Sequence, residues 1–298
     1  MDFAMNDNDR QNLFKLFRDH GDVLGTDGTT RVALESIIRA IRELKCPAEE
    51  FETLLRELLS SIKATEPRIT PLIHLVEQFE SEMVNEFGGD LRTTKAKVIR
   101  ILEDKIALLD GISQKMIANG LACIKRYDVI IVYSTSGVVR NILVEANRIG
   151  KPFEVLILRQ DFTKTRKLIW TASSEDIDHQ VIPEYNLSNF VTKANKLFLG
   201  ATSITPDGKA VCPLGAAEVV GLCHLNGIKI HLFANSLKFS HRASRHQAIH
   251  AKEESRREAD TSYAMTIHSH CLVDLKHIDL LVREDGIVTQ PSTPAAMR

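Results

Sequence analysis

The chain has 298 residues, of which 44% are hydrophobic, and its 38 Lys and Arg residues nearly balance 39 Asp and Glu residues to give a net charge of −1. This length favours two domains, and the balanced charge excludes the long-range positive field of a dedicated binder of nucleic acid or acidic membranes. Five scattered cysteines without CxxC spacing predict reduced thiols rather than a disulfide framework or a zinc ribbon. No apolar run approaches about 18 residues, so we expect a cytoplasmic protein without a membrane span.

The first third of the sequence has the periodicity of amphipathic helices. Apolar residues three and four positions apart predict four helices, with stripes from Leu34 to Leu44, Leu54 to Ile62, Leu72 to Met83 and Val98 to Met116. Turns are predicted at 25–28, at 46–47 and at 88–89, where Gly or Pro interrupts the pattern. We therefore expect residues 1–120 to form a helical domain.

From about Asp128 the pattern changes to short apolar, β-branched runs that alternate with helical segments. Strands are predicted at 129–132, 153–158, 197–199, 228–233 and 278–282, and helices at 138–146, 165–170 and 216–225. Continuous apolar strands that alternate with helices indicate a mostly parallel sheet covered on both faces. The predicted fold class is α/β, with an open-sheet domain over residues 121–290 and a flexible tail over 291–298.

The segment before the last predicted strand is rich in charge of both signs and poor in apolar residues. Over residues 240–263 this composition predicts a solvated helix or a mobile lid. His268, His270, Cys271 and His277 follow closely in the sequence, but no carboxylate partner accompanies them. We expect no metal and no cofactor.

Open parallel sheets bind ligands beyond the carboxyl ends of their strands. The residues that follow the predicted strands are small, hydroxylated or cationic, and the candidate ligand-binding residues are Ser134, Thr135, Ser136, Gly137, Arg159, Gly200, Ala201, Thr202 and Lys238. Residues 134–137 also open a helix, whose free N–H groups and dipole favour a phosphate, and Arg159 and Lys238 add positive charge. The alternative is that the Ser and Thr side chains merely cap helices and turns. We expect a phosphorylated small molecule as the ligand.

Several of these segments together resemble the initiation factor 2B α/β/δ family, which also includes methylthioribose-1-phosphate isomerases and archaeal ribose-1,5-bisphosphate isomerases. The resemblance covers roughly residues 95–290 and is carried by Val132–Leu143, Gly200-Ala201 with Asp207-Gly208, Ser236–Phe239 and Leu280–Val288. It implies a helical N-terminal domain on a Rossmann-like C-terminal domain, and a homodimer or an assembly with related subunits. The apolar run 214–222 offers a helix face that could pack against a symmetry mate.

The positions that carry isomerase chemistry in this family differ here. The isomerases place a reactive cysteine after the first strand, where this chain has Ser134 or Thr135, and an aspartate after the Gly-Ala pair, where it has Thr202. A hydroxyl shuttles protons poorly at neutral pH without an activating base. Because regulatory subunits of the family likewise lack the catalytic pair, the resemblance implies a noncatalytic subunit in translation initiation that senses a phosphorylated sugar or nucleotide.

Two other interpretations stay open at this point. One is a divergent sugar-phosphate aldose–ketose isomerase, an intramolecular oxidoreductase, that uses Asp207 and Cys212 as acid and thiol or uses a hydroxyl. The other is an interaction module whose crevice holds no ligand.

Overall fold

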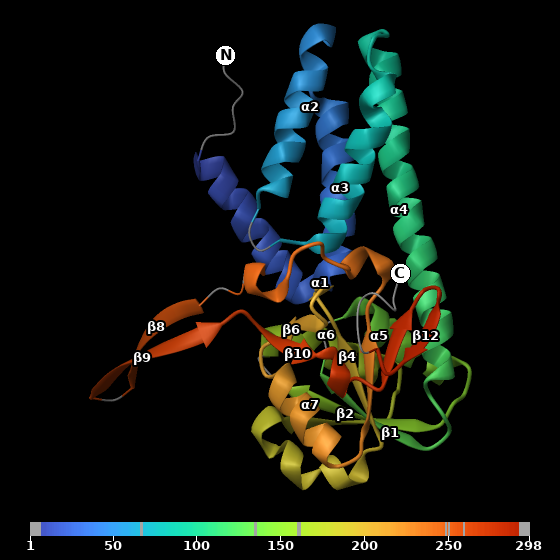
Figure 1. Cartoon of the computed structure of the whole chain (residues 1–298), viewed down its shortest axis with the longest axis vertical. Coiled ribbons are helices and arrows are strands. Elements are labelled where there is room, and N and C mark those ends of the chain that lie inside the picture. Colours follow the sequence, from blue (N-terminus) through green and yellow to red (C-terminus); the bar gives the residue numbers. More distant parts are fainter. Residues whose placement is uncertain are drawn as a thin grey trace. The chain divides into compact units, whose positions relative to one another are not determined.

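The computed structural model describes residues 7–65, 68–133, 136–159, 162–247, 249, 251–258 and 260–291, with the side chains of all of these except 7–23, 162–164, 252, 254 and 258. The chain divides into two compact units, Met1–Gln114 and Lys115–Arg298 (Figure 1). The predicted tail, apart from Pro291, lies outside the described residues, as do Ser134 and Thr135.

The first unit is helical. Its elements are α1 Asp7–Glu43, α2 Ala48–Lys63, α3 Thr70–Met83, the 3-10 turn η1 Val84–Glu86 and α4 Leu91–Ala122, whose last residues enter the second unit. The four predicted helical stripes are confirmed, and their buried members include Leu34, Leu55, Leu75 and Leu102. Among the described residues, no helix is long and apolar enough to cross a membrane.

The turn predicted over 25–28 is wrong in its extent. Gly25 alone leaves the helical conformation, with φ 68 and ψ 174, and α1 continues on both sides of it. In the first turn after Gly25, the hydroxyls of Thr29 and Thr30 donate to the carbonyl groups of Gly25 and Thr26, four residues earlier, at 2.9 and 2.8 Å. The turn at 88–89 is confirmed, since Gly88 has φ 112 between η1 and α4.

The second unit is built on a seven-stranded sheet with the order β12-β11-β7-β4-β1-β2-β3. Its strands are β1 Asp128–Tyr133, β2 Phe153–Arg159, β3 His179–Pro183, β4 Lys196–Gly200, β7 Lys229–Phe233, β11 Leu280–Arg283 and β12 Gly286–Thr289. Every pairing in this sheet is parallel except that of β12 with β11. The predicted α/β fold, a helical part followed by a mostly parallel, Rossmann-like open sheet, is confirmed.

Three helices pack against this sheet: α5 Gly137–Arg148, α6 Phe162–Ser174 and α7 Ala216–Leu225. The first two connect strands in one direction from β1, whereas α7 precedes β7 on the other side of β4. With right-handed crossovers, helices on the two sides of β1 must lie on opposite faces of the sheet. The strands are therefore covered on both faces, as their continuous apolar runs predict.

Smaller elements complete the second unit. A three-stranded antiparallel sheet has the order β10-β6-β5, with β5 Ser203–Ile204, β6 Lys209–Pro213 and β10 His270–Asp274. Short 3-10 turns are η2 Glu184–Asn189, η3 Val191–Lys193, η4 Ser236–Lys238, η5 Ser244–His246 and η6 Leu275–His277. The side chains of β4, β6 and α7 contribute to one continuous buried cluster in this unit.

Of the two alternatives predicted for residues 240–263, a solvated helix or a mobile lid, the helix is wrong. The chain there forms β8 Ala251–Glu258, which pairs with β9 Thr261–His268 in a two-stranded antiparallel hairpin (Figure 1). The reason is visible in β9, where Tyr263, Met265 and Ile267 alternate with small or polar residues. This period of two suits a strand and not a helix. We call this hairpin the arm.

Candidate ligand-binding site at the strand ends

The strand order places the expected ligand site at the junction of β1 and β4. The chain proceeds from β1 through β2 to β3 in one direction, and from β4 through β7 to β11 in the other. Open α/β sheets bind ligands where the order reverses, beyond the carboxyl ends of the strands. The candidate residues that the structure describes lie at or shortly after the carboxyl ends of parallel strands. We call them the strand-end rim: Ser136, Gly137, Arg159, Gly200, Ala201, Thr202 and Lys238.

Two cations on the helices that follow β1 and β2 interact electrostatically. Arg140 is in the first turns of α5, near enough that its Nη2 would lie 3.7 Å from a Cβ on Gly137. Burial lowers the pKa of the Arg140 guanidinium. Burial also lowers the pKa of the Lys167 ammonium on α6, and the positive charge of Arg140 lowers it further. The two groups therefore repel each other in a partly desolvated environment.

In the part of the chain that the structure describes, neither cation has a counter-ion. Among the described residues, no side chain or carbonyl group forms an ion pair or hydrogen bond with the charged group of Arg140 or Lys167. The start of α5 adds backbone N–H groups and the positive end of the helix dipole at the same place. The arrangement favours an anion, because an anion would relieve the repulsion between the cations and accept hydrogen bonds from the backbone N–H groups at the start of α5.

Other residues of the rim take part in hydrogen bonds with the backbone. Ser136 is the N-cap of α5 and accepts a hydrogen bond from Val139 N at 3.5 Å, so the capping interpretation applies to it. Lys238 is 4% exposed and donates to Ala201 O at 3.0 Å. Thr202 N donates to Val211 O at 2.8 Å. Arg159 is exposed at the end of β2 and is the rim cation most open to solvent.

Tyr133 lies at the carboxyl end of β1, at the junction of β1 and β4. It is the last residue of β1, it is 1% exposed, and its hydroxyl contacts Glu184 Oε2 at 2.9 Å and the carbonyl oxygen of Leu214. Gly215, with φ 88, precedes α7 at this point. A Cβ on Gly215 would overlap the Tyr133 hydroxyl and the Glu184 carboxylate, so only glycine allows α7 to begin here.

The structure does not support Asp207 and Cys212 as an acid and thiol pair. The exposed Asp207 carboxylate accepts hydrogen bonds from Ser244 Oγ and from Ser244 N at 2.9 Å, and mainly the Ser244 hydroxyl lowers its pKa to about 2. Cys212 is 0% exposed on β6, where burial raises the pKa of its thiol well above the ordinary range. Asp207 is therefore a carboxylate that anchors η5, and Cys212 stays protonated in the core.

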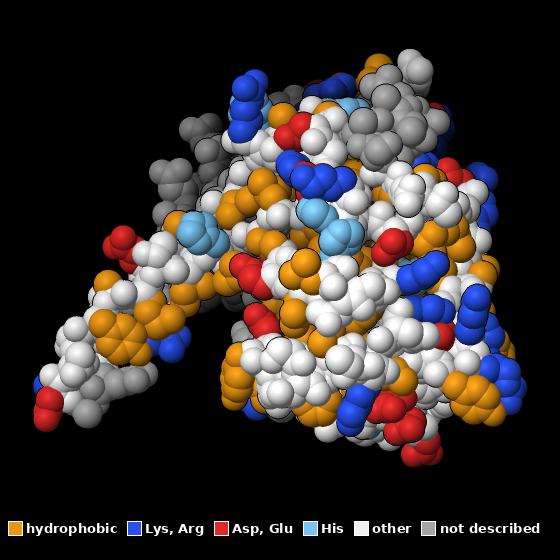
Figure 2. Space-filling view, turned by 60° about the horizontal axis from the view of Figure 1, so that its bottom comes forward, with side chains coloured by type: hydrophobic (Ala, Val, Ile, Leu, Met, Phe, Trp, Pro, Cys, Tyr) orange, Lys and Arg blue, Asp and Glu red, His pale blue; other side chains and the backbone are white. Residues whose placement is uncertain are grey.

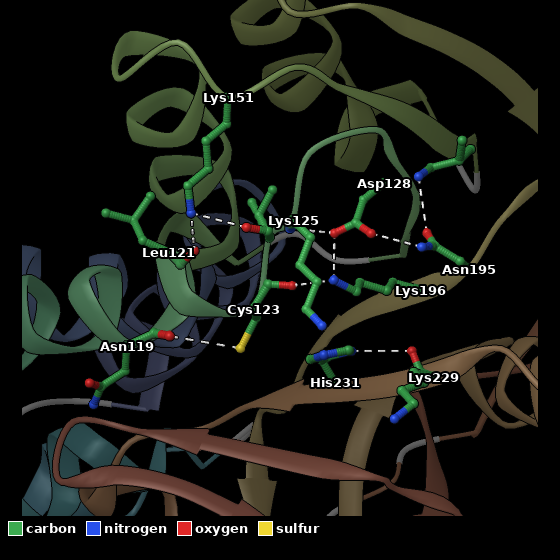
Figure 3. Close-up of polar contacts among 12 residues, drawn as sticks. Asn119, Leu121, Cys123, Lys125, Asp128, Lys151, Asn195, Lys196, Lys229 and His231 are labelled. Atoms are coloured by element: carbon green, nitrogen blue, oxygen red, sulfur yellow. Dashed lines mark hydrogen bonds and ion pairs between the residues drawn. The ribbon is translucent and has the colours of Figure 1, made fainter.

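A second polar cluster lies at the opposite, amino ends of the strands (Figure 3). Lys196 Nζ forms a buried ion pair with Asp128 and donates to Cys123 O at 2.6 Å, and Asn195 Nδ2 donates to Asp128 Oδ1 at 2.7 Å. Burial would raise the pKa of Asp128, but the hydrogen bonds from Lys196, Lys125 N–H and Asn195 hold it below its ordinary value. Since every partner is internal, this cluster joins α4 to β1 and β4.

The described residues contain no group of three or more His, Cys, Asp or Glu side chains arranged to hold a metal ion. Of the histidines considered from the sequence, His277 packs against the ring of His224 with centroids 5.1 Å apart, and His268 ends β9 on the arm. The thiol of Cys271 donates to Pro213 O at 3.1 Å.

Sequence reasoning missed Arg140 and Lys167 as members of the site. Both stand within predicted helices, 138–146 and 165–170, so a search of the first turns of the helices after β1 and β2 would have found the two cations. Their mutual proximity depends on the packing of α5 against α6, which no local pattern contains.

Comparison with known proteins relates this chain to subunits of translation initiation factors. A family model described as the initiation factor 2 subunit family matches residues 22–280. A Pyrococcus furiosus protein named as an eIF-2B subunit 2-like translation initiation factor is 27% identical over 245 residues, which cover 80% of this chain and 84% of that protein.

Two solved structures share the fold. The structure of 5-methylthioribose 1-phosphate isomerase from Pyrococcus horikoshii OT3 has a TM-score of 0.79 at 15% identity and covers 97% of this chain and 86% of its own. A chain of the tetrameric eIF2B-beta2-delta2 complex from C. thermophilum has a TM-score of 0.72 at 16% identity, with 91% of this chain and 90% of that chain covered.

Proposed function

Because this chain belongs to the initiation factor 2 subunit family, we propose that it is a noncatalytic regulatory or scaffolding subunit of the eIF-2B type that acts in the cytoplasm. We propose further that a phosphorylated sugar or nucleotide binds at its strand-end rim and that the chain associates with its own copies or with related subunits. The single observation that carries the ligand proposal is the pair of Arg140 and Lys167: the charge of Arg140 acts on Lys167, neither cation has a counter-ion among the described residues, and Arg140 lies near Gly137 at the start of α5.

A phosphate group fits this arrangement in charge and in geometry. Arg140 offers a planar fork of N–H donors and Lys167 offers a point charge, and the start of α5, near the Arg140 guanidinium, adds backbone N–H groups. Arg159, at the end of β2, adds a third cation at the edge of the rim. The sugar or nucleoside would extend toward Thr202, which is partly exposed, since Gly200 and Ala201 at the end of β4 are buried.

Thermal unfolding with added ligand tests this proposal directly. Inorganic phosphate, ribose 5-phosphate and AMP should raise the melting temperature, because a ligand that binds only the folded state stabilises it by mass action. Arg140→Ala and Lys167→Ala should each weaken binding by at least about tenfold, which is the effect of losing one charge-assisted hydrogen bond.

Lys229→Ala is the matched control, since Lys229 is an exposed cation at the amino end of β7, opposite the rim. It should leave the ligand-induced shift unchanged. A full shift of the melting temperature in both Arg140→Ala and Lys167→Ala would contradict a phosphate site at this rim. The absence of a shift with any of the three probes would contradict it as well.

The noncatalytic part of the proposal rests on the chemistry of the junction. Thr202 stands after the Gly-Ala pair, Asp207 is engaged with Ser244, and Cys212 is a buried, protonated thiol. None of these groups exchanges protons readily with a ligand at the rim near pH 7. We expect no isomerisation of methylthioribose-1-phosphate or ribose-1,5-bisphosphate above background. Turnover on the order of 1 s⁻¹ or faster would contradict this. The rate of Asp207→Asn would then show whether Asp207 is the base, since the substitution removes the carboxylate.

The association with other subunits is supported by the similarity to a chain of the eIF2B-beta2-delta2 tetramer. Light scattering of the purified chain should give the mass of a dimer or a larger assembly at micromolar concentration. A monomer that also fails to bind related subunits in the same experiment would remove the scaffolding role while leaving the ligand proposal intact.

A further inference from the structure

The arm presents an open strand edge. Strand β8 pairs with β9 in a two-stranded sheet, and no other described strand pairs with it. The described side chains of β8 are all exposed, and the arm projects from the body of the second unit (Figures 1 and 2). An isolated two-stranded hairpin is marginally stable in water, and an open edge is a template for a further strand.

The charges of β8 form a palindrome of opposite signs. The strand reads AKEESRRE from Ala251 to Glu258. Around Ser255, residues at equal distances carry opposite charges: Glu254 with Arg256, Glu253 with Arg257, and Lys252 with Glu258. When two copies of such a strand run antiparallel about a two-fold axis at Ser255, every charged residue stands opposite a residue of the other sign.

No neighbouring register has this property. A shift of one residue in one direction places Lys252 opposite the partner's Arg257, and a shift in the other direction places Glu253 opposite the partner's Glu258. Parallel, in-register pairing places each charge opposite itself. Like charges directly opposite one another destabilise a strand pair, so the charge pattern specifies both the direction and the register of pairing.

We propose that a second copy of this chain docks on the free edge of β8, so that β8 pairs antiparallel with the partner's β8 about Ser255 in a four-stranded sheet. This contact is isologous, since Glu253 meets the partner's Arg257 and Arg257 meets the partner's Glu253. The inference rests on the proposed self-association and names the surface that supports it. Strand β9 carries no comparable charge pattern, which makes β8 the edge that is specific for its own copy.

A charge-exchange experiment on the full chain tests this contact. Glu253→Arg alone places Arg opposite the partner's Arg257, and Arg257→Glu alone places Glu opposite the partner's Glu253. Each single variant should therefore self-associate at least about tenfold more weakly than the wild type in sedimentation equilibrium, because two favourable pairs become repulsive. The double variant E253R/R257E should associate like the wild type, and an equimolar mixture of the two single variants should form a mixed assembly.

Glu57→Arg on α2 and Arg39→Glu on α1 are the controls, since both residues are exposed and the substitutions change the net charge by the same amounts. They should not alter the assembly. The Glu253–Arg257 contribution should also weaken as NaCl rises from 0.05 to about 0.5 M, because exposed charge pairs are screened by salt.

Ser255→Cys supplies a direct test of the register. The two substituted positions would face each other across the axis, so mild oxidation with copper phenanthroline should join them as a covalent dimer on a non-reducing gel. Ala264→Cys, on the β9 side of the arm opposite Ser255, should cross-link much less. Single charge variants that keep the wild-type mass, or equal cross-linking at the two positions, would overturn the β8 contact. If those variants still self-associate, the chain uses another surface for self-association, and the proposed scaffolding role remains.

Discussion

Tyr133 and Gly215 illustrate how single residues determine the geometry of the rim. Tyr133→Phe should lower the free energy of unfolding by about 1–3 kcal/mol, since the Glu184 carboxylate and the Leu214 carbonyl group lose a buried donor. Gly215→Ala should be more damaging, because its Cβ would overlap that hydroxyl. Urea denaturation measures both changes. Gly150→Ala is a matched control, since Gly150 has a similar φ of 73 but open space around it; equal losses at the two glycines would contradict the steric explanation.

His231 should make the stability depend on pH. Its ring is 2% exposed and packs against Phe198. Burial lowers its pKa to about 4 from the ordinary 6.5; nearby Lys196 lowers it too, whereas Lys229 O, Asp279 and Asp128 oppose the shift. The unfolded chain therefore binds more protons between these values, so the free energy of unfolding falls as the pH falls from 6.5 toward 4, by up to about 3 kcal/mol.

The pH effect of His231 can be separated from that of the carboxylates. His231→Phe keeps an aromatic ring beside Phe198 and should flatten the stability profile between pH 6.5 and 4.5 in urea denaturation. The contribution of Asp128, whose pKa is lowered, is lost only below its unfolded value of 3.8. A profile in His231→Phe that is as steep as in the wild type would show that other groups cause the dependence.

At the scale of elements, the buried cluster at the amino ends of the strands ties α4, β1 and β4 together. Asp128→Ala leaves the Lys196 ammonium buried without its carboxylate and should cost about 3–5 kcal/mol. Arg148→Ala breaks an ion pair with Glu175 in which the Arg148 side chain is 60% exposed, and it should cost about 0–1 kcal/mol. Comparable losses in urea denaturation would mean that the buried pair is not the stronger anchor.

At the scale of the whole molecule, the separate core of the second unit predicts that it folds alone. Residues 115–298 contain the complete sheet, its covering helices and one continuous buried cluster. A fragment with these residues should show a cooperative thermal transition by circular dichroism and should keep the phosphate-dependent shift. A fragment without a transition would show that the sheet needs the helical unit. The same comparison with a fragment that begins at residue 121 tests the predicted domain boundary.

The helices of the first unit, the main strands and the mostly parallel sheet could be predicted from the sequence, because these depend on periods of 3.6 and two residues and on turn residues that are local. It also identified the family from ordered motifs in the sheet domain, whereas the family model extends the match back to residue 22. Strands with weaker patterns, such as β3 and β6, were missed because their pairing partners decide their conformation.

Which groups meet depends on the tertiary structure. It paired β8 with β9 where composition suggested a helix or a lid, it buried Cys212 and engaged Asp207 with Ser244, and it brought Arg140 near enough to Lys167 for its charge to lower the pKa of Lys167. Each of these facts depends on contacts between segments far apart in the chain, whose energies no local pattern contains. The charge pattern of β8 can be read from the sequence, but it predicts a contact only because the segment is a strand with an open edge. Opposite charges at equal distances from Ser255 face one another only in an extended, antiparallel pair.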